Sequence, residues 1–189
     1  GRMGARVKEG EGVTDIRRDA ETGLYTVTTT AGEYQAPVVI NAAGVWAPEI
    51  GTFLGIDIPI IPRQGQILVA EVIGTLVSQT VTEFGYIMTK YAKKDYKRNV
   101  TPDMEKYGVA MVVEPTDAGN FLVGSSRQFR GFDTRTDFLT LQALAQRAMR
   151  FFPCIQNINV IRSYAGLRPY TKDHRAIISE TDLKGFYVA

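Results

Sequence analysis

The sequence predicts an α/β fold with α+β character, in which much of the sheet is antiparallel and only two or three helices occur. Three observations support this class. Long stretches alternate apolar and polar residues and are rich in Val, Thr and Tyr, which is typical of half-buried strands. Residues 38–43 form a largely apolar run, typical of a strand covered on both faces. Only residues 137–152 show a clear helical period.

The first part of the chain predicts a β-meander followed by a strand and a short helix. Alternation in residues 5–19 and 24–36, which "AETG" separates, indicates antiparallel strands with one buried face. After the apolar run, "APEIGTFLG" is typical of a short helix that ends at Gly55. Pro59 and Pro62 then interrupt a strand-like run, so we expect the chain to cross there from one sheet to another.

Residues 84–125 predict an antiparallel sheet. Its expected strands are "GYIMT", "GVAMVVEP" and "NFLVGSS", and "TDAGN" between the last two is typical of a hairpin turn. Residues 90–107, between the first two strands, are polar and basic. Two interpretations stay open for them: a lid or partner-docking loop, or a solvated excursion at the surface.

The helix at residues 137–152 has Thr136 or Asp137 as its N-cap and Pro153 after its end. Its expected buried face consists of Phe138, Leu141, Leu144 or Ala145, Ala148 and Phe152. The stretch "NINVIRSYAGLRPYT" then predicts a strand that ends in a glycine turn. Two more short strands are expected at "AIISE" and "GFYVA".

Composition limits the classes of protein and partner. The 189 residues correspond to one large domain or two small ones. A net charge of +2 is too small to indicate nucleic-acid or membrane binding, and no apolar run reaches the ~18 residues of a membrane span. A single cysteine excludes an internal disulfide framework and fits a reducing compartment, so we expect a cytoplasmic protein. The chain starts close to a strand-like pattern and stops in the apolar "GFYVA", which indicates a piece of a larger protein.

Few side chains are available for chemistry. His174 and Cys154 are the single histidine and the single cysteine, so we expect no His/Cys metal cluster and no Ser-His-Asp or Cys-His arrangement. We expect His174 to be exposed in the polar "TKDHRA", and we interpret Cys154 as a packing thiol rather than a nucleophile. Neither a G-x-G-x-x-G nor a P-loop occurs. Chemistry in this protein would therefore depend on an organic cofactor.

Three segments resemble one family in their order and spacing. They are "VVINAAGVWAPEIGTFLGIDIPIIPRQGQILV", "DAGNFLVGSSRQFRGFDT" and "RSYAGLRPYTKDHRAIIS". Together they resemble the FAD-dependent D-amino acid oxidase-like (DAO) superfamily, which includes glycine oxidase, sarcosine oxidase and the flavin subunits of proline and hydroxyproline dehydrogenases. The resemblance implies that residues 1–57 are the later part of a Rossmann-like FAD-binding domain. It further implies that residues 58–162 form a substrate-binding domain with a mixed, largely antiparallel sheet, and that residues 163–189 return to the FAD-binding domain.

The resemblance also assigns roles to residues of this chain. Arg168, in "AGLRP", would hold the carboxylate of the substrate, and Tyr86 would be a second substrate contact. Because no cysteine lies near the "T-x-D" of this segment, the FAD would be non-covalent. Trp46 has a packing anchor as its alternative role. The implied FAD contacts are the backbone at Val13, the bare strand tip Ala42, Ala43 and Gly44, then Trp46, Gly65, and a turn at Gly166 and Leu167.

The function implied is oxidation of the C–N bond of a small amine or amino acid by hydride transfer to FAD. Two alternatives stay open: a non-catalytic binding or assembly subunit of a heteromeric dehydrogenase, and a related flavoenzyme that oxidises a 2-hydroxy acid or a glycerol phosphate. The expected partners are the small-molecule substrate and either a second copy of the chain or a partner subunit. The 189 residues alone lack a glycine-rich pyrophosphate-binding turn, so we expect them to be inactive and to hold no FAD tightly.

Overall fold

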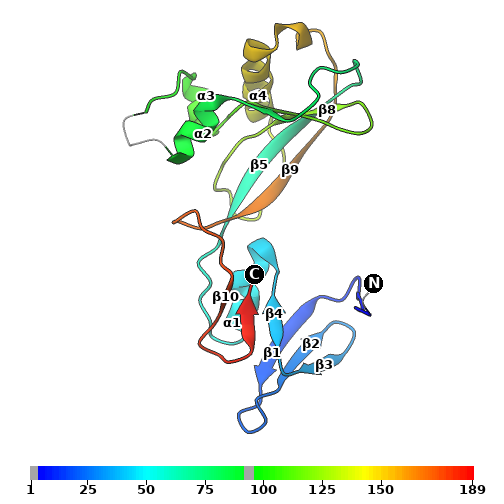
Figure 1. Ribbon diagram of the computed structural model, residues 1–189, viewed down its shortest axis with the longest axis vertical. Coiled ribbons are helices and arrows are strands. Elements are labelled where there is room, and N and C mark those ends of the chain that lie inside the picture. Colours follow the sequence, from blue (N-terminus) through cyan, green and yellow to red (C-terminus); the bar gives the residue numbers. More distant parts are fainter. Residues whose placement is uncertain (1–3, 92–95) are drawn as a thin grey trace. The chain divides into compact units, whose positions relative to one another are not determined.

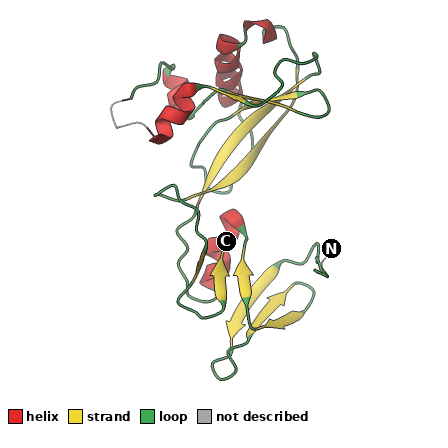
Figure 2. Ribbon diagram, viewed as in Figure 1, coloured by secondary structure: helices red, strands yellow, loops and turns green. Residues whose placement is uncertain are grey.

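A computed structural model of the chain describes residues 4–91 and 96–189. The chain forms two compact units, of which unit 1 comprises Gly1–Ile61 and Pro169–Ala189, and unit 2 comprises Pro62–Arg168. The first crossing thus falls beside Pro62, where the prolines predicted a change of sheet. Most strands belong to antiparallel sheets (Figure 2), so the predicted fold class is confirmed.

Unit 1 begins with the predicted β-meander (Figure 1). Its strands are β1 (Val13–Arg18), β2 (Tyr25–Thr29) and β3 (Glu33–Ala36), which pair antiparallel in the order β1-β2-β3. Ile16 and Tyr25 are buried, as the alternation of apolar and polar residues requires. In the turn between β1 and β2, the Asp19 carboxylate accepts a hydrogen bond of 2.7 Å from the backbone N–H of Thr22.

The second sheet of unit 1 has the order β10-β11-β4. Its strands are β10 (Ser179–Glu180), β11 (Phe186–Val188) and β4 (Val39–Asn41). β4 runs parallel to β11, and Val39 packs on the buried cluster that includes Phe186. On the other face of β4, Ile40 is 62% exposed and Val38 is 50% exposed. The expectation that residues 38–43 are covered on both faces is therefore wrong for this chain.

A short helical segment follows β4. It consists of a 3₁₀ helix (Gly44–Trp46) and α1 (Ala47–Thr52), which confirms the predicted short helix. The buried Asn41 fixes the turn, because its Nδ2 donates to the Ala47 carbonyl at 2.9 Å and its Oδ1 accepts from the Ala43 N–H at 3.2 Å. The tip of β4 is thus held by a side chain inside the unit.

Unit 2 is built on a five-stranded sheet in the order β6-β7-β8-β5-β9. The strands are β5 (Ile61–Ala70), β6 (Val81–Thr82), β7 (Val112–Pro115), β8 (Phe121–Gly124) and β9 (Val160–Tyr170). The predicted hairpin turn between β7 and β8 is confirmed, since the Thr116 N–H donates to the Asn120 carbonyl at 3.0 Å. The long strand β5 lies between β8 and β9 and carries much of the site described below.

The helices of unit 2 are α2 (Phe84–Tyr91), α3 (Pro102–Lys106), α4 (Phe138–Phe151) and a 3₁₀ helix (Pro153–Ile155). The expected strand "GYIMT" is wrong, because these residues lie in α2. A short apolar run has too few residues for its period to distinguish a helix from a strand.

Helix α4 begins at the predicted N-cap, where the Asp137 carboxylate accepts from the Thr140 N–H at 2.9 Å. Leu144 and Ala148 are buried in the core of unit 2, as predicted. Phe138 is 72% exposed, so its assignment to the buried face is wrong. It is the first helical residue, and the helix turns it away from the core.

The basic stretch 90–107 lies partly outside the described residues, which omit 92–95. Its later part packs on unit 2: Met104 of α3 and Tyr107 are buried in the core cluster. The interpretation of this stretch as a solvated excursion is therefore wrong for Met104 and Tyr107, whereas residues 102, 103, 105 and 106 are exposed.

Candidate functional site

Arg168 lies on β9, and its guanidinium packs on the backbone of Gly65 in the neighbouring strand β5. A Cβ at position 65 would stand 2.7 Å from Arg168 Nη2 and 2.9 Å from its Cζ, which is closer than real Cβ contacts. Glycine at position 65 therefore provides the space that the Arg168 side chain occupies. The sequence singled out both residues but gave no indication that they touch.

Arg168 is half-buried, and its side chain makes no hydrogen bond or ion pair with the residues that the structure describes. Burial lowers the pKa of its guanidinium, the charge of Arg63 lowers it further, and Tyr86 opposes both. Arginine is nevertheless not deprotonated in proteins, so the side chain keeps its charge. A half-buried cation of this kind gains from an anionic ligand that can desolvate with it.

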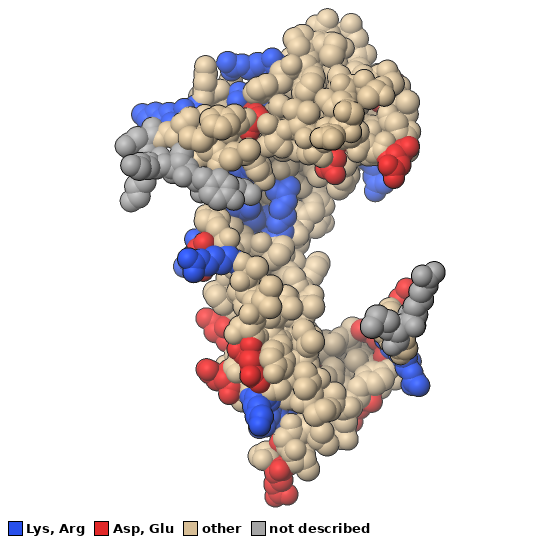
Figure 3. All heavy atoms as spheres, viewed as in Figure 1, with Lys and Arg blue, Asp and Glu red and all other residues tan. Residues whose placement is uncertain are grey.

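Tyr86 and Arg127 lie beside this charge. The Arg127 Cζ is 3.9 Å from the centroid of the Tyr86 ring, the distance of a cation–π stack. Burial lowers the pKa of Arg127, Tyr86 opposes this, and the charges of Arg63 and Arg168 lower the pKa further. We call the group formed by Arg63, Tyr86, Arg127 and Arg168 the arginine cluster. Figure 3 shows Lys and Arg side chains gathered on the visible face of unit 2 near the start of β5.

The buried carboxylate of this region, Glu83, forms ion pairs with other arginines. Glu83 precedes α2, is 3% exposed and contacts Arg98 and Arg147, with 2.6 Å between Arg147 Nε and Glu83 Oε2. No Asp or Glu within residues 4–91 and 96–189 forms an ion pair with Arg127 or Arg168. The sequence analysis missed Arg63, Arg127 and Glu83. The "SSRQFR" that follows β8 was the available signal for Arg127.

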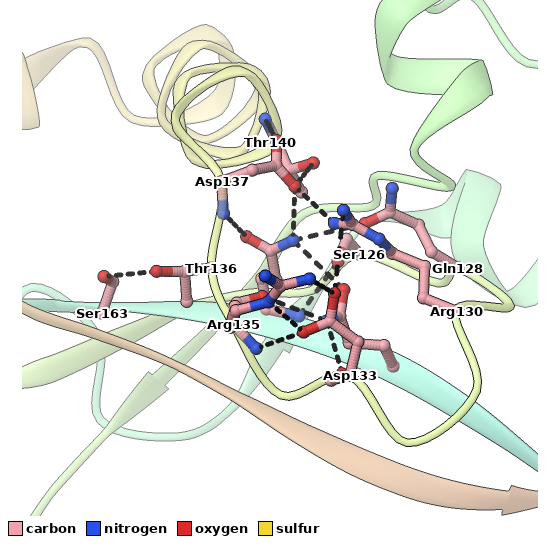
Figure 4. A network of polar contacts seen from close by, with 11 residues as sticks. Ser126, Gln128, Arg130, Asp133, Arg135, Thr136, Asp137, Thr140 and Ser163 are labelled. Carbon is pink, nitrogen blue, oxygen red and sulfur yellow. Dashed lines mark hydrogen bonds and ion pairs between the residues drawn. The ribbon is translucent and has the colours of Figure 1, made fainter.

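The opposite face of β5 carries a hydrogen-bonded network (Figure 4). Gln64 and Gln66 are fully buried there. Gln66 Oε1 accepts from the Asp137 N–H at 3.0 Å, and Gln66 Nε2 donates to Asp137 Oδ2 at 2.9 Å. Gln64 Nε2 donates to the Asp133 carbonyl at 2.7 Å. Because side chains alternate along a strand, this network fixes β5 from one side while Gly65 faces Arg168 on the other.

The residues expected at the FAD strand tip lie together in unit 1. Ala42, Ala43 and Gly44 follow β4, and Gly44 has φ +57° with no atom within 4 Å of a Cβ placed on it. Trp46 is 52% exposed, and its two expected roles, FAD contact and packing anchor, stay predictions. Val13 lies apart from them, on β1 of the other sheet of unit 1.

Gly166 and Leu167 lie inside β9, so the expected glycine turn is wrong. Gly166 is exposed, and no atom lies within 4 Å of a Cβ placed on it. A strand tolerates one glycine when neighbouring residues keep the ladder intact, which the motif alone did not reveal. Unit 2 therefore brings Gly65, Tyr86 and Arg168 together, with Gly166 two residues before Arg168.

The remaining chemistry-bearing residues lie outside these groups. His174 is exposed, as predicted, and meets the Tyr170 ring edge-on at 5.3 Å between ring centroids. Cys154 is also exposed, so the interpretation of this residue as a packing thiol is wrong. The described residues contain no group of three or more His, Cys, Asp or Glu side chains that could hold a metal ion. Among the helices described, none has the length and apolar character to cross a membrane.

Comparison with curated proteins finds relatives over nearly the whole chain. The hydrogen cyanide synthase subunit HcnC of Pseudomonas protegens is 31% identical over 90% of this chain and 35% of its own length. Glycine oxidase of Geobacillus kaustophilus is 25% identical over 98% of this chain and 43% of its own length. The chain thus spans between 35% and 43% of the length of these two relatives.

Solved structures agree in fold. The crystal structure of the Geobacillus kaustophilus glycine oxidase matches 98% of this chain and 43% of its own, with a TM-score of 0.76 and 24% identity. That of an L-proline dehydrogenase from P. horikoshii matches 99% of this chain and 45% of its own, with a TM-score of 0.80 and 20% identity. The sequence model of the family described as FAD dependent oxidoreductase (DAO) matches residues 1–189. The chain therefore belongs to the DAO family of FAD-dependent oxidoreductases.

Proposed function

We propose that the protein containing this chain oxidises the C–N bond of a small amine or amino acid that carries a carboxylate. The observation that carries the proposal is Arg168, a half-buried guanidinium with no anionic partner among the described residues. Support comes from the relatives, since glycine oxidases match most of the chain.

Bare backbone in this chain would suit a bound FAD. Open space lies beside the bare backbone of Gly44 in unit 1 and of Gly166 in unit 2, and a flat ring system needs such backbone. We propose Ala42, Ala43, Gly44, Trp46, Gly166 and Leu167 as residues that hold it non-covalently. When bound, FAD supplies the electron acceptor for the oxidation.

The contribution of this chain is orientation of the substrate. The planar fork of Arg168 can donate two parallel hydrogen bonds to a carboxylate and so fix both its position and its plane. Gly65 leaves room for the guanidinium, and the Gln64 and Gln66 network holds β5 in place. A substrate fixed in this way meets the cofactor in one orientation, which lowers the entropic part of the barrier.

The test is anaerobic reduction of the flavin in the full-length protein. Glycine, sarcosine and proline are compared with glycolate, 2-hydroxyglutarate and glycerol 3-phosphate, and loss of the visible flavin band is followed. We expect reduction by at least one amine and by none of the hydroxy compounds. Reduction by a hydroxy compound alone would replace the proposal with the hydroxy-acid alternative.

The relative HcnC is named as a subunit, which supports a second proposal: the protein acts beside a partner subunit. The observation to make is whether a second protein co-purifies with the full-length protein at a fixed ratio. A flavin that amines reduce only in the presence of that partner would support the assembly role. Full reduction of the protein alone, with no partner retained, would contradict it.

A further inference from the structure

We propose that the arginine cluster selects substrates with two carboxylates, Arg168 binding one and Arg127 binding the other. The inference rests on the proposed function, because it names the substrate class of the same site. Arg127 is then a specificity-determining residue, and its role differs from that of Arg168, which binds the carboxylate common to all substrates of the site.

The Arg127 side chain has buried donors without acceptors among the described residues. Its Nε and Nη2 are buried and have no hydrogen-bond partner among the described residues. A guanidinium presents five N–H donors, and a buried donor left unsatisfied costs free energy. The stack on Tyr86 covers a face of the guanidinium, and hydrogen bonds are made at its edge. A carboxylate that draws the side chain out of its cover on binding would supply acceptors for these donors.

The described carboxylates form no ion pair with Arg127 or Arg168 and so leave their charges uncompensated. Burial and the neighbouring arginines lower the pKa of both Arg127 and Arg168, which means that each cation is held against a cost. One substrate carboxylate compensates one of these charges. Glu83 cannot compensate the other, because its two oxygens contact Arg98 and Arg147. A second carboxylate on the substrate would.

Arg127 and Arg168 lie on opposite sides of the strand β5. Arg127 belongs to the segment that continues β8 alongside β5, where the Gln128 N–H donates to the Gln64 carbonyl at 3.0 Å. Arg168 lies on β9, on the other side of β5. Adjacent strands are about 4.8 Å apart, so the two backbones are roughly 10 Å apart. Two long side chains anchored at that separation suit two anionic groups at opposite ends of a small molecule.

The experiment uses matched substrates with the full-length, FAD-loaded protein. Iminodiacetate and sarcosine differ only in a carboxylate on the nitrogen substituent, and aspartate and alanine differ only in a carboxylate on the side chain. We expect the wild type to prefer the dicarboxylate of at least one pair. Arg127→Met should lower kcat/KM for that dicarboxylate by about tenfold or more, the effect of losing a hydrogen bond to a charged group. For the monocarboxylate the change should stay within about twofold.

Two further variants separate specificity from folding. Arg127→Lys keeps the charge and should restore part of the preference. Arg162→Met removes a positive charge from an exposed position on the same strand as Arg168 and should leave the preference unchanged. Melting curves of all variants show whether each one is folded.

The outcomes distinguish this inference from the proposed function. Equal use of the monocarboxylate and the dicarboxylate in both pairs, with no change in Arg127→Met, overturns the inference and leaves the proposed function intact. If no amine reduces the flavin, the proposed function fails, and calorimetric titration with malonate and acetate decides the inference. Tighter binding of malonate that is lost in Arg127→Met supports it, and equal binding of the two acids overturns it.

Discussion

Gly65 shows at the scale of one residue how the site is made. Its missing side chain leaves the volume that the Arg168 guanidinium fills, with 2.7 Å between a hypothetical Cβ and Nη2. The sequence identified both residues by their motifs. Their contact depends on the pairing of β5 with β9, which are far apart in the chain, so no local pattern could predict it. For the same reason, the stack of Arg127 on Tyr86 was not foreseen.

Gly65→Ala should impair binding of the carboxylate while leaving the fold intact. The added Cβ meets the far end of a flexible side chain, so the guanidinium moves aside at little cost in stability. We expect KM for the amine to rise about tenfold, the loss of about one charged hydrogen bond, with a nearly unchanged melting temperature. Gly32→Ala, where no atom lies within 4 Å of the new Cβ, is the matched control. An unaltered KM in Gly65→Ala would mean that Arg168 does not bind substrate from this position.

Glu83→Ala should be strongly destabilising. The substitution leaves Arg98 and Arg147 as buried cations without their shared carboxylate. Breaking a buried ion pair in this way costs ~3–5 kcal/mol in the free energy of unfolding. Asp15→Asn, which breaks an exposed pair with Arg17, should cost at most about 1 kcal/mol. Denaturant unfolding of both variants measures the difference, and equal costs would show that Glu83 does not stabilise unit 2.

At the scale of elements, β5 and the start of α4 form one structural group. Asp137 caps α4 and also binds the side chain of Gln66 on β5, so the helix and the strand hold each other (Figure 4). The sequence predicted α4 and its cap, because capping is local. The sequence could not predict the hydrogen bonds between Asp137 and Gln66. It also assigned the residues of α2 to a strand, because a short apolar run fits a helix as well as a strand.

Asp137 should contribute stability that acid removes. Burial raises the pKa of its carboxyl, but hydrogen bonds from Gln66 and Thr140 and the charge of Arg130 hold the pKa below its usual range. A pKa lowered by folding gives stability that is present above the unfolded pKa of about 4 and is lost as the pH falls through the folded pKa. The hydrogen bond from Arg135 lowers the pKa of Asp133 to about 2 with the same sign, so the loss should extend from about pH 4 to about pH 2.

Melting curves between these pH values test the contribution of Asp137. Asn is an equally good N-cap, so Asp137→Asn should melt nearly as the wild type does at neutral pH and lose less stability in acid. Asp137→Ala removes the cap and one of the hydrogen bonds of Gln66, which should cost about 1–3 kcal/mol at neutral pH. Asp117→Asn, at an exposed turn position, is the control. If the melting temperatures of the wild type and of Asp137→Asn fall equally as the pH is lowered, Asp137 does not contribute the acid-sensitive stability.

At the scale of the whole molecule, unit 1 leaves apolar side chains and bare backbone exposed. The apolar side chains of Val38 and Ile40 are exposed on one face of β4, and the backbone beside Gly44 is open. The family could be predicted from three motifs. The exposed face of β4 could not be predicted. An apolar run indicates that a strand is buried, but it does not show which residues cover the strand.

The 189 residues alone should not retain FAD, whereas the full-length protein should. The pyrophosphate of FAD is bound by the backbone N–H groups at a helix N-terminus after a glycine-rich turn, and the sequence contains no G-x-G-x-x-G. Both proteins are purified with added FAD, passed through a desalting column and examined by absorbance. A visible flavin band retained by the 189-residue protein would contradict the expectation.

The most direct measurement of the central claim compares sarcosine with dimethylamine in the wild type and in Arg168→Met of the full-length protein. Only sarcosine has a carboxylate, so only its kcat/KM for flavin reduction should depend on Arg168. We expect Arg168→Met to lower kcat/KM for sarcosine about a hundredfold and to leave kcat/KM for dimethylamine almost unchanged. A hundredfold loss corresponds to a bidentate charged contact of about 3 kcal/mol. Equal losses with both amines, or no loss with sarcosine, would contradict the claim that Arg168 binds the substrate carboxylate.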